Sequence, residues 1–237
     1  MPRIARDIGK TGWAHVIVRG INRESLFYDE DDYKRFKTTI ERYQKEIVFE
    51  IAAYCMMSNH VHLLLYVEDG SYAALLKKLL VSYAAYYNKK YSRVGPVFQD
   101  RFRSEPIDDE RYLLTVARYI YRNPQKAGIC LAKNYPYTFI QRDGILSGYF
   151  DTNEELTAFL ETENCDICLE FESTDEHADT KALELIKTIT KETNPQAIQS
   201  LEKNQRDQIL VKLKEQGLSV RQISRLTGVN RNIVQRA

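Results

Sequence analysis

The order in which apolar periodicity changes along the chain is the feature that most limits its fold. Residues 13–19 follow the alternating pattern of a strand, whereas residues 30–46 carry apolar side chains at the spacing of a helix. The pattern then switches several more times. The expected elements are a strand over 13–19, a helix over 30–46, strands over 48–55 and 60–67, a helix over 71–91, a strand over 97–104 and a helix over 109–122, which Asn123-Pro124 should end.

This order of strands and helices predicts an α+β fold. The adjacent strands 48–55 and 60–67 are joined by the short Ser58-Asn59 turn and should pair as a hairpin. Because a helix precedes and another follows the hairpin, the series is that of a ferredoxin-like or RRM-like antiparallel sheet covered by helices. Such a sandwich hosts many unrelated functions, so the function has to be argued from particular residues.

The last part of the chain is helical and basic. Residues 201–237 contain eight Lys and Arg against three acidic residues. Within this range Gly217 should end one helix, and Ser219 with Gln222 forms a capping box for the next. After a short turn that contains glycine, Asn230 should cap a final helix. The layout predicts a small all-α domain with a helix-turn-helix.

The helix-turn-helix should have an apolar face and a polar face. The side chains expected to hold its helices together are Ile223, Leu226, Val229 and Ile233. The side chains expected to meet DNA bases and phosphates are Arg221, Arg231, Asn232, Gln235 and Arg236. A helical hairpin that serves only for packing or dimerisation is the alternative. The turn spacing and the basic face together favour DNA binding.

Charge is unevenly distributed, although the net charge is only +1. Residues 151–180 hold eleven acidic side chains and no Lys or Arg, so all 34 basic residues lie elsewhere with 22 acidic ones, a net charge of +12. We therefore expect a domain over 1–150, an acidic connecting segment over 151–180 and a helical domain over 181–237. A basic body suits a polyanionic partner. A solvated linker unrelated to any partner explains the acidic segment equally well.

The composition is that of an ordinary folded protein, with 43% hydrophobic and 28% charged residues. The first residues do not resemble a signal peptide, and no uncharged apolar stretch approaches the ~20 residues of a membrane helix. We therefore expect a cytoplasmic protein with no membrane partner. The four cysteines are scattered and do not indicate a disulfide framework.

Two of the four histidines lie one residue apart within an apolar strand. Side chains at positions i and i+2 of a strand share a face, so His60 and His62 should point the same way and Val61 the opposite way. Two imidazoles about 5 to 7 Å apart on a rigid sheet can hold a metal ion. Two surface histidines on an open sheet face are the alternative, which the strongly apolar flanks make less favourable.

Four separate motifs extend this pattern into a family resemblance. They are HVIVRGINRESLF at 15–27, SNHVHLLL at 58–65, FQDRFRSEPI at 98–107 and RYIYRNPQKAG at 118–128. The motifs resemble those of the HUH single-tyrosine transposases (IS200-like), and most closely the group associated with repetitive extragenic palindromes (REPs). HUH denotes histidine, hydrophobic residue, histidine, and Val61 is the hydrophobic member. The resemblance covers about residues 10–140.

The resemblance implies a nickase-ligase that needs Mg²⁺ or Mn²⁺ and acts on single-stranded, hairpin-containing DNA through a 5′-phosphotyrosine. His60 and His62 would hold the metal, although histidine sites often hold zinc. The family pattern places the nucleophile at Tyr119 and a third metal ligand at Asn123. The chemistry agrees, because a phenol with a pKa of about 10 is a poor nucleophile and an anionic phosphodiester repels attack.

Helix geometry is compatible with these two assignments. At about 100° per residue, Tyr119 and Asn123 lie about 40° apart on one flank of the apolar stripe. Tyr121 lies on the other flank, about 160° from Asn123. For Tyr119 taken alone, a packing role on the helix flank is the alternative.

Polar residues near the expected strand ends are further candidates for DNA contacts. They are Arg19, Asn22, Arg101 and Arg103. Each could also be a solvated surface residue. His15 could support a metal ligand through a hydrogen bond, or it could be an ordinary histidine within the sheet.

Two other functions stay open. A DNA-binding regulator that retains the fold without cleaving DNA is the main alternative. A small zinc hydrolase that uses His60 and His62 is less favoured, because no obvious carboxylate base lies near them in the sequence. Either a monomer or a homodimer fits the sequence, since the helix that carries Tyr119 could serve its own histidines or those of a partner.

Overall fold

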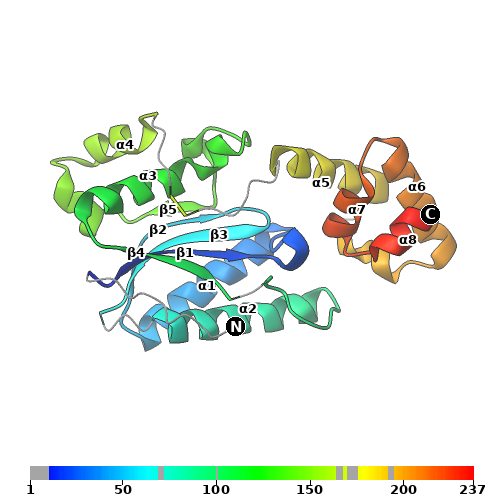
Figure 1. Ribbon diagram of the computed structural model, residues 1–237, viewed down its shortest axis with the longest axis horizontal. Coiled ribbons are helices and arrows are strands. Elements are labelled where there is room, and N and C mark those ends of the chain that lie inside the picture. Colours follow the sequence, from blue (N-terminus) through cyan, green and yellow to red (C-terminus); the bar gives the residue numbers. More distant parts are fainter. Residues whose placement is uncertain (1–10, 69–71, 100, 164–167, 170–175, 192–194) are drawn as a thin grey trace, which may run out of the picture.

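The computed structural model describes residues 11–68, 72–99, 101–163, 168–169, 176–191 and 195–237. It has a central β-sheet with helices on both faces and a separate group of helices at one end (Figure 1). The predicted α+β class is confirmed. The parts of the sequence-based expectations that lie outside the described residues are 1–10, Ser71, Asp100, 164–167 and 170–175.

Five strands form one antiparallel sheet in the order β4-β1-β3-β2-β5. Their bounds are Trp13–Arg19 for β1, Glu50–Met56 for β2, His60–Tyr66 for β3, Arg103–Ile107 for β4 and Thr138–Ile140 for β5. β2 and β3 form the predicted hairpin, and β5 extends the sheet beyond β2.

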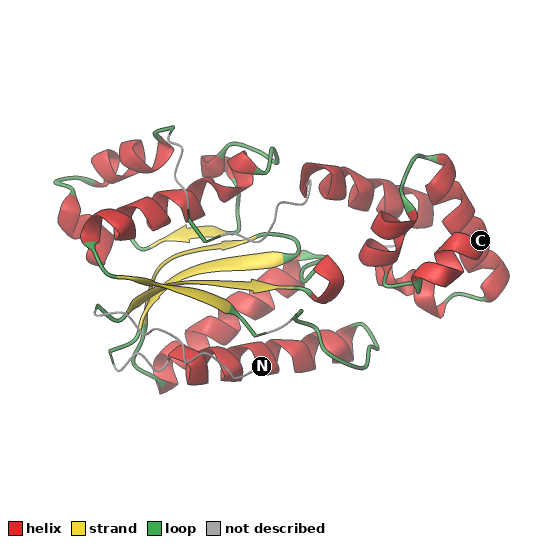
Figure 2. Ribbon diagram, viewed as in Figure 1, coloured by secondary structure: helices red, strands yellow, loops and turns green. Residues whose placement is uncertain are grey.

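Helices cover both faces of the sheet. The bounds are Glu30–Glu46 for α1, Tyr72–Lys90 for α2, Glu110–Lys126 for α3, Asn153–Glu161 for α4, Glu176–Thr190 for α5, Lys203–Glu215 for α6, Val220–Thr227 for α7 and Arg231–Arg236 for α8. Short 3₁₀ helices are Ile21–Arg23 (η1), Ala132–Asn134 (η2), Ile145–Tyr149 (η3) and Pro195–Ser200 (η4). α1 and α2 lie on one face of the sheet, and α3 and α4 lie on the other (Figure 2).

The side-chain alternation of β3 separates the two cores. Val61, Leu63 and Leu65 belong to the core beneath α1 and α2, whereas Leu64 belongs to the core beneath α3. Since alternate residues point to opposite faces, His60 and His62 share the α3 side with Leu64. The strand therefore presents both histidines to a covered face.

The strand expected over 97–104 is observed in two pieces. Phe98 forms an isolated antiparallel bridge with Gly20, just past β1, and β4 starts at Arg103. Val97 and Phe102 are buried in the core of α1 and α2, and the ring of Phe102 packs 5.9 Å from that of Tyr72. The apolar spacing over these residues thus reflects both backbone pairing near Phe98 and packing on α2.

Helix α3 continues through the proline that was expected to end it. Ala127 N donates to Asn123 O, so the helical hydrogen bonds continue past the proline to Lys126, and Ile129 N then donates to Pro124 O across the left-handed Gly128 to close the helix. A proline inside a helix removes one backbone hydrogen bond. Here Pro124 is itself buried, and this packing offsets the loss. Asn123 and Lys126 thus stay on the same helix as Tyr119.

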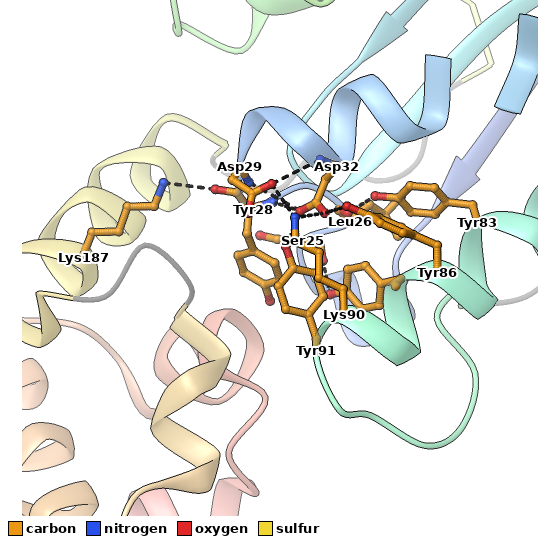
Figure 3. Close-up of polar contacts among 11 residues, drawn as sticks. Ser25, Leu26, Tyr28, Asp29, Asp32, Tyr83, Tyr86, Lys90, Tyr91 and Lys187 are labelled. Carbon is orange, nitrogen blue, oxygen red and sulfur yellow. Dashed lines mark hydrogen bonds and ion pairs between the residues drawn. The ribbon is translucent and has the colours of Figure 1, made fainter. Parts of the chain in front are cut away.

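A buried carboxylate fixes the start of α1. Asp32 is fully buried and accepts hydrogen bonds from Tyr28 N, Tyr86 Oη, Tyr91 Oη and Lys90 Nζ (Figure 3). Burial alone would lower the pKa of Lys90, but its hydrogen bonds to the carboxylates at the start of α1 raise that pKa above its usual value. The network ties α1 to α2.

The acidic segment is not wholly a connector. Its residues 153–161 form α4, and Leu156 and Leu160 are buried in the core beneath α3. Thr152 caps this helix by accepting a hydrogen bond from Glu155 N. The proposed division of the chain at residue 150 stays a prediction, and α4 packs with the sheet domain.

The C-terminal helices, α5 to α8, have a core of their own. The predicted capping box of Ser219 and Gln222 is present, Gly228 ends α7 with a φ of 69°, and Asn230 caps α8. The predicted caps of α7 and α8 and the glycine-containing turn between them are therefore observed. One core residue was wrong: Ile233 is 36% exposed, whereas Val234 is fully buried. Helix α8 begins at Arg231, and this start places Val234, the residue after Ile233, on the buried side of the helix.

The C-terminal helices are attached to the sheet domain through buried tyrosines. Tyr28 Oη accepts a hydrogen bond from Gln196 Nε2 at 2.9 Å and donates to Leu226 O at 3.3 Å. Gln196 Nε2 also donates to Tyr87 Oη at 3.1 Å. Lys187 of α5 reaches across to Tyr28 O at 3.1 Å (Figure 3). Polar contacts shielded from water thus hold the two parts together.

Within the described ranges, no helix has both the length and the apolar character that are needed to cross a membrane.

Candidate active site

The candidate active site lies on the sheet face that α3 covers. His60 and His62 are at the start of β3, and His15 lies beside them on β1. All three side chains are buried. The ring centroids of His60 and His62 are 4.9 Å apart, and those of His15 and His62 are 5.3 Å apart.

Hydrogen bonds orient both candidate metal ligands. His60 Nδ1 is 2.8 Å from Asn59 Oδ1, and His62 Nδ1 is 3.0 Å from His15 Nε2. If each Nδ1–H donates to these acceptors, Nε2 is the ring nitrogen with a lone pair for a metal ion. His15 then carries its hydrogen on Nδ1, a buried atom that has no hydrogen-bond partner within the described structure.

Two of these imidazoles are held in the neutral form. Burial lowers the pKa of His15 to about 3. The pKa of His62 lies well below its usual value because of burial, and the neighbouring His60, His15, Lys126 and Arg19 lower it further. A neutral imidazole is the form that binds a metal ion.

Helix α3 brings Tyr119 and Asn123 onto these histidines. The Tyr119 ring centroid is 5.6 Å from that of His62 and 5.9 Å from that of His15. The Asn123 amide is 3.2 Å from His62 Nε2. The predicted common flank is thus observed, and the histidines and the tyrosine belong to the same chain.

Tyr121 lies elsewhere, as the helix geometry predicted. Burial raises the pKa of Tyr121, and the nearby carboxylate of Glu161 on α4 raises it further. The Tyr121 hydroxyl therefore faces the helices above the sheet and is directed away from the histidines.

The donor set fits a divalent cation with few protein ligands. His60 and His62 each have a ring nitrogen that could bind such an ion. Asn123 has a side-chain oxygen that could do so, and its side-chain nitrogen lies 3.2 Å from His62 Nε2. Among the described residues no group of three or more His, Cys, Asp or Glu side chains is arranged to hold a metal ion. Asn123, which contacts His62, is the candidate for a third donor.

Comparisons with known proteins identify the family of the chain. Residues 10–123 match the family model described as "Transposase IS200 like". A curated relative from Haemophilus influenzae, named as a REP-associated tyrosine transposase, is 32% identical over 157 residues, which are 60% of this chain and 88% of the relative. The chain belongs to this transposase family.

The fold of the transposase also matches a solved structure. That structure is of a REP-associated tyrosine transposase bound to a REP hairpin, with a TM-score of 0.56 and 18% sequence identity. The match covers 73% of this chain and 100% of the other. At this identity, the likeness concerns the fold.

The candidate DNA contacts of the sheet domain of the transposase fall into separate places. Arg19 pairs with His60 across the strands and is buried next to the histidines. Asn22 is exposed on η1, just beyond β1. Arg103 is exposed on β4, opposite Ile17. Arg101 lies apart from the histidines, in a groove along α2.

The candidate DNA contacts of the transposase helix-turn-helix are solvent-exposed. Arg221 lies on α7, and the other four lie on α8: Arg231, Asn232, Gln235 and Arg236. Arg221 and Arg231 line a cleft that also contains Asn22 of the sheet domain. The structure thus brings together residues that are about 200 positions apart in the sequence.

Sequence reasoning missed two basic residues near these sites. Lys126 places its Nζ 4.4 Å from the centre of the Tyr119 ring. Its spacing of seven residues from Tyr119, two helical turns, was a usable signal, but the helix was expected to end before it. Arg23 lines the same cleft as Arg221, and only the tertiary structure reveals this.

Proposed function

We propose that this transposase is a metal-dependent endonuclease and strand transferase for single-stranded DNA, with Tyr119 as the nucleophile. The observation that carries the proposal is the position of Tyr119 beside His62 and one helical turn before Asn123. His60, His62 and Asn123 would hold Mg²⁺ or Mn²⁺. The bound ion would neutralise charge on the scissile phosphate and on the departing oxygen.

The chemistry is a balanced exchange of phosphate esters. Tyr119 Oη loses its proton to solvent and attacks the phosphorus, and the bond from phosphorus to the 3′-oxygen breaks. The products are a 5′-phosphotyrosine and a 3′-hydroxyl, which takes up a proton. When the 3′-hydroxyl of another strand attacks the phosphotyrosine, a phosphodiester forms and Tyr119 is released. The enzyme can therefore cut and rejoin without an external energy source.

The protein's own residues support the attack by Tyr119. The ammonium group of Lys126 beside its ring favours the phenolate electrostatically. His15 holds His62 in the tautomer that leaves Nε2 for the ion. Both residues act by positioning or by charge, and neither forms a bond to DNA.

Hairpin-containing DNA is the substrate that the comparisons favour. The solved structure with the same fold holds a REP hairpin, and the curated relative is named for its association with REPs. The exposed polar face of α8 suits the major groove of a duplex. We propose that the sheet domain acts on a single strand next to a stem, and that α8 binds duplex DNA.

The experiment is a search for the covalent intermediate. A hairpin oligonucleotide labelled at its 3′ end is incubated with protein and Mn²⁺ or Mg²⁺, and denaturing gels separate protein-linked DNA. We expect an adduct with the wild type and with Tyr121→Phe, and none with Tyr119→Phe or with EDTA. Tyr121→Phe is the matched control, because it removes the same atom from the same helix.

Two outcomes would contradict the proposal. An adduct that persists in Tyr119→Phe would assign the nucleophile to another residue. A wild-type protein that binds the hairpin but forms no adduct with either metal would favour the second candidate function, a DNA-binding regulator without cleavage activity. The exposed α8 is the observation that favours this candidate.

A further inference from the structure

A polar cleft separates the helix-turn-helix from the sheet domain. Its volume is about 690 Å³. One wall is formed by Asn22 and Arg23 of η1 and by Gln99, whose backbone N donates to Arg19 O at the end of β1. The other wall is formed by α7 and the turn that precedes α8. The residues that line the cleft on this second wall are Arg221, Ser224, Arg225, Gly228, Val229, Asn230 and Arg231.

The cleft is strongly basic. Four arginines line it: Arg23, Arg221, Arg225 and Arg231. The acidic residue in the described lining is Glu24, whose carboxylate pairs with Arg93 at 2.9 Å. Three of the arginines, Arg23, Arg221 and Arg231, form no ion pair within the described part of the chain. Such a concentration of guanidinium groups is suited to phosphate oxygens.

The cleft is also connected to the candidate active site. Asn59 Nδ2 donates to Arg23 O at 3.5 Å, while Asn59 Oδ1 accepts from His60 Nδ1 at 2.8 Å. Gly20 N donates to Asn59 O at 2.8 Å, which fixes the start of η1 against the start of β3. Asn59 thus contacts both Arg23 in the cleft wall and the candidate metal ligand His60.

We infer that this cleft binds the sugar-phosphate backbone of one DNA strand, on its way from the duplex on α8 to the histidine site. The inference rests on the proposed function and adds a path for the DNA between helix α8 and the histidine site of the sheet domain. The volume of the cleft is in the range of small-ligand sites, about 300 to 1,000 Å³, which suits a short stretch of one strand. The neutral polar side chains of the lining, Asn22, Gln99, Ser224 and Asn230, supply further hydrogen bonds to phosphate and sugar.

The experiment measures DNA affinity as a function of salt without any cleavage. A fluorescein-labelled hairpin with a single-stranded extension is titrated in EDTA, and anisotropy gives Kd at several salt concentrations. Phosphate contacts carry no sequence information, so the probe does not have to match the natural target. The variants are Arg23→Gln on one wall and Arg221→Gln on the other. The control is Arg111→Gln, an exposed arginine at the opposite end of α3 from Asn123.

We expect each cleft variant to weaken binding several-fold and to reduce the slope of log K against log salt by about 1, the loss of one phosphate contact. Arg111→Gln should match the wild type. Thermal melting shows whether each variant is folded. If Arg23→Gln keeps the wild-type Kd and slope while Arg221→Gln loses affinity, DNA contacts the helix-turn-helix outside the cleft and the inference is overturned.

Failure of this inference and failure of the proposed function give different results. Cleavage by Tyr119 is measured as a covalent adduct with metal, whereas the cleft is measured by binding in EDTA. Normal adduct formation with an unchanged salt slope in Arg23→Gln would contradict DNA binding in the cleft and support the proposed enzymatic function. A reduced salt slope in Arg23→Gln, together with a wild-type protein that never forms an adduct, would support DNA binding in the cleft and contradict the proposed enzymatic function.

Discussion

At the scale of single residues, the site depends on how His62 is held. Its Nδ1 faces His15 and its Nε2 faces Asn123, so one imidazole joins β1 to α3. His15 has no route to solvent and stays neutral, because burial lowers its pKa to about 3. A buried acceptor of this kind fixes both the tautomer and the ring orientation of a metal ligand.

His15→Phe should therefore weaken metal binding without removing a ligand. Loss of such a hydrogen-bond partner typically reduces metal affinity about 10- to 100-fold. Calorimetric titration of the DNA-free protein with Mn²⁺ measures the effect. Tyr66→Phe, a change on the same sheet face at the far end of β3, should keep wild-type affinity. Equal affinities in His15→Phe and the wild type would show that His15 does not orient His62.

Asp32 is the second residue on which much depends. Asp32→Asn removes the buried negative charge that Lys90 contacts at 2.8 Å, although Lys90 is 24% exposed and keeps its contact with Asp29 at 2.6 Å. Loss of the hydrogen bonds to the charged carboxylate should cost about 1 to 3 kcal/mol of unfolding free energy. Urea denaturation of the variant measures the loss. Asp31→Asn, the exposed neighbour, should change stability by less than about 0.5 kcal/mol. A similar small change in Asp32→Asn would contradict the role of the network.

At the scale of elements, helix ends decide where functional side chains point. α3 continues through Pro124 and so keeps Lys126 beside Tyr119. α8 begins at Arg231, directly after its cap Asn230, and so exposes Arg231 and Asn232. In the first case packing extends a helix past a local stop signal. In the second case the cap sets the rotation of a short helix.

Ser219→Ala tests the cap of α7. The Ser219 hydroxyl accepts from Gln222 N at 3.2 Å, and the loss of such a cap costs about 1 kcal/mol. Hydrogen exchange of the α7 amides should become faster, and thermal melting should detect a less stable C-terminal domain. Ser219→Asp should retain the wild-type behaviour because aspartate is an equally good cap. If Ser219→Ala and Ser219→Asp exchange alike, the capping box does not stabilise α7.

At the scale of the whole molecule, the helix-turn-helix is held in a fixed relation to the sheet domain. The hydrogen bonds of Gln196 with Tyr28 and Tyr87 lie at the junction, and all three side chains are buried. This docking creates the cleft that Arg23 and Arg221 line. The mutual placement of the sheet domain and the C-terminal helices thus depends on a few polar contacts away from water.

Gln196→Leu should loosen this junction. Two buried tyrosine hydroxyls would lose their donor, at a cost of about 1 to 3 kcal/mol. Small-angle X-ray scattering should show a larger radius of gyration, and limited proteolysis should separate the C-terminal helices from the sheet domain more readily. Gln199→Leu is the control, because Gln199 bonds Thr227 within the C-terminal helices. Unchanged scattering and proteolysis in Gln196→Leu would mean that other contacts hold the domains together.

Much of the fold and part of the site followed from local patterns. The hairpin of β2 and β3, the shared face of His60 and His62 and the common flank of Tyr119 and Asn123 were predicted from periodicity. Periodicity has this power because alternation in strands and rotation in helices fix which neighbours share a face. It did not show that the strand expected over 97–104 is divided into a bridge at Phe98 and β4 from Arg103, and it failed where packing extended a helix past Pro124.

The sequence by itself determined which side chains lie together within one element, and through its motifs it indicated the transposase family. It determined this because backbone geometry converts spacing into direction. Only the tertiary structure decided that α3 lies over the histidines of its own chain, that His15 completes the contacts of His62, and that Arg23 and Arg221 face one cleft. Those relations join residues that are distant along the chain, and the packing of helices on a sheet, rather than any local spacing, brings them together.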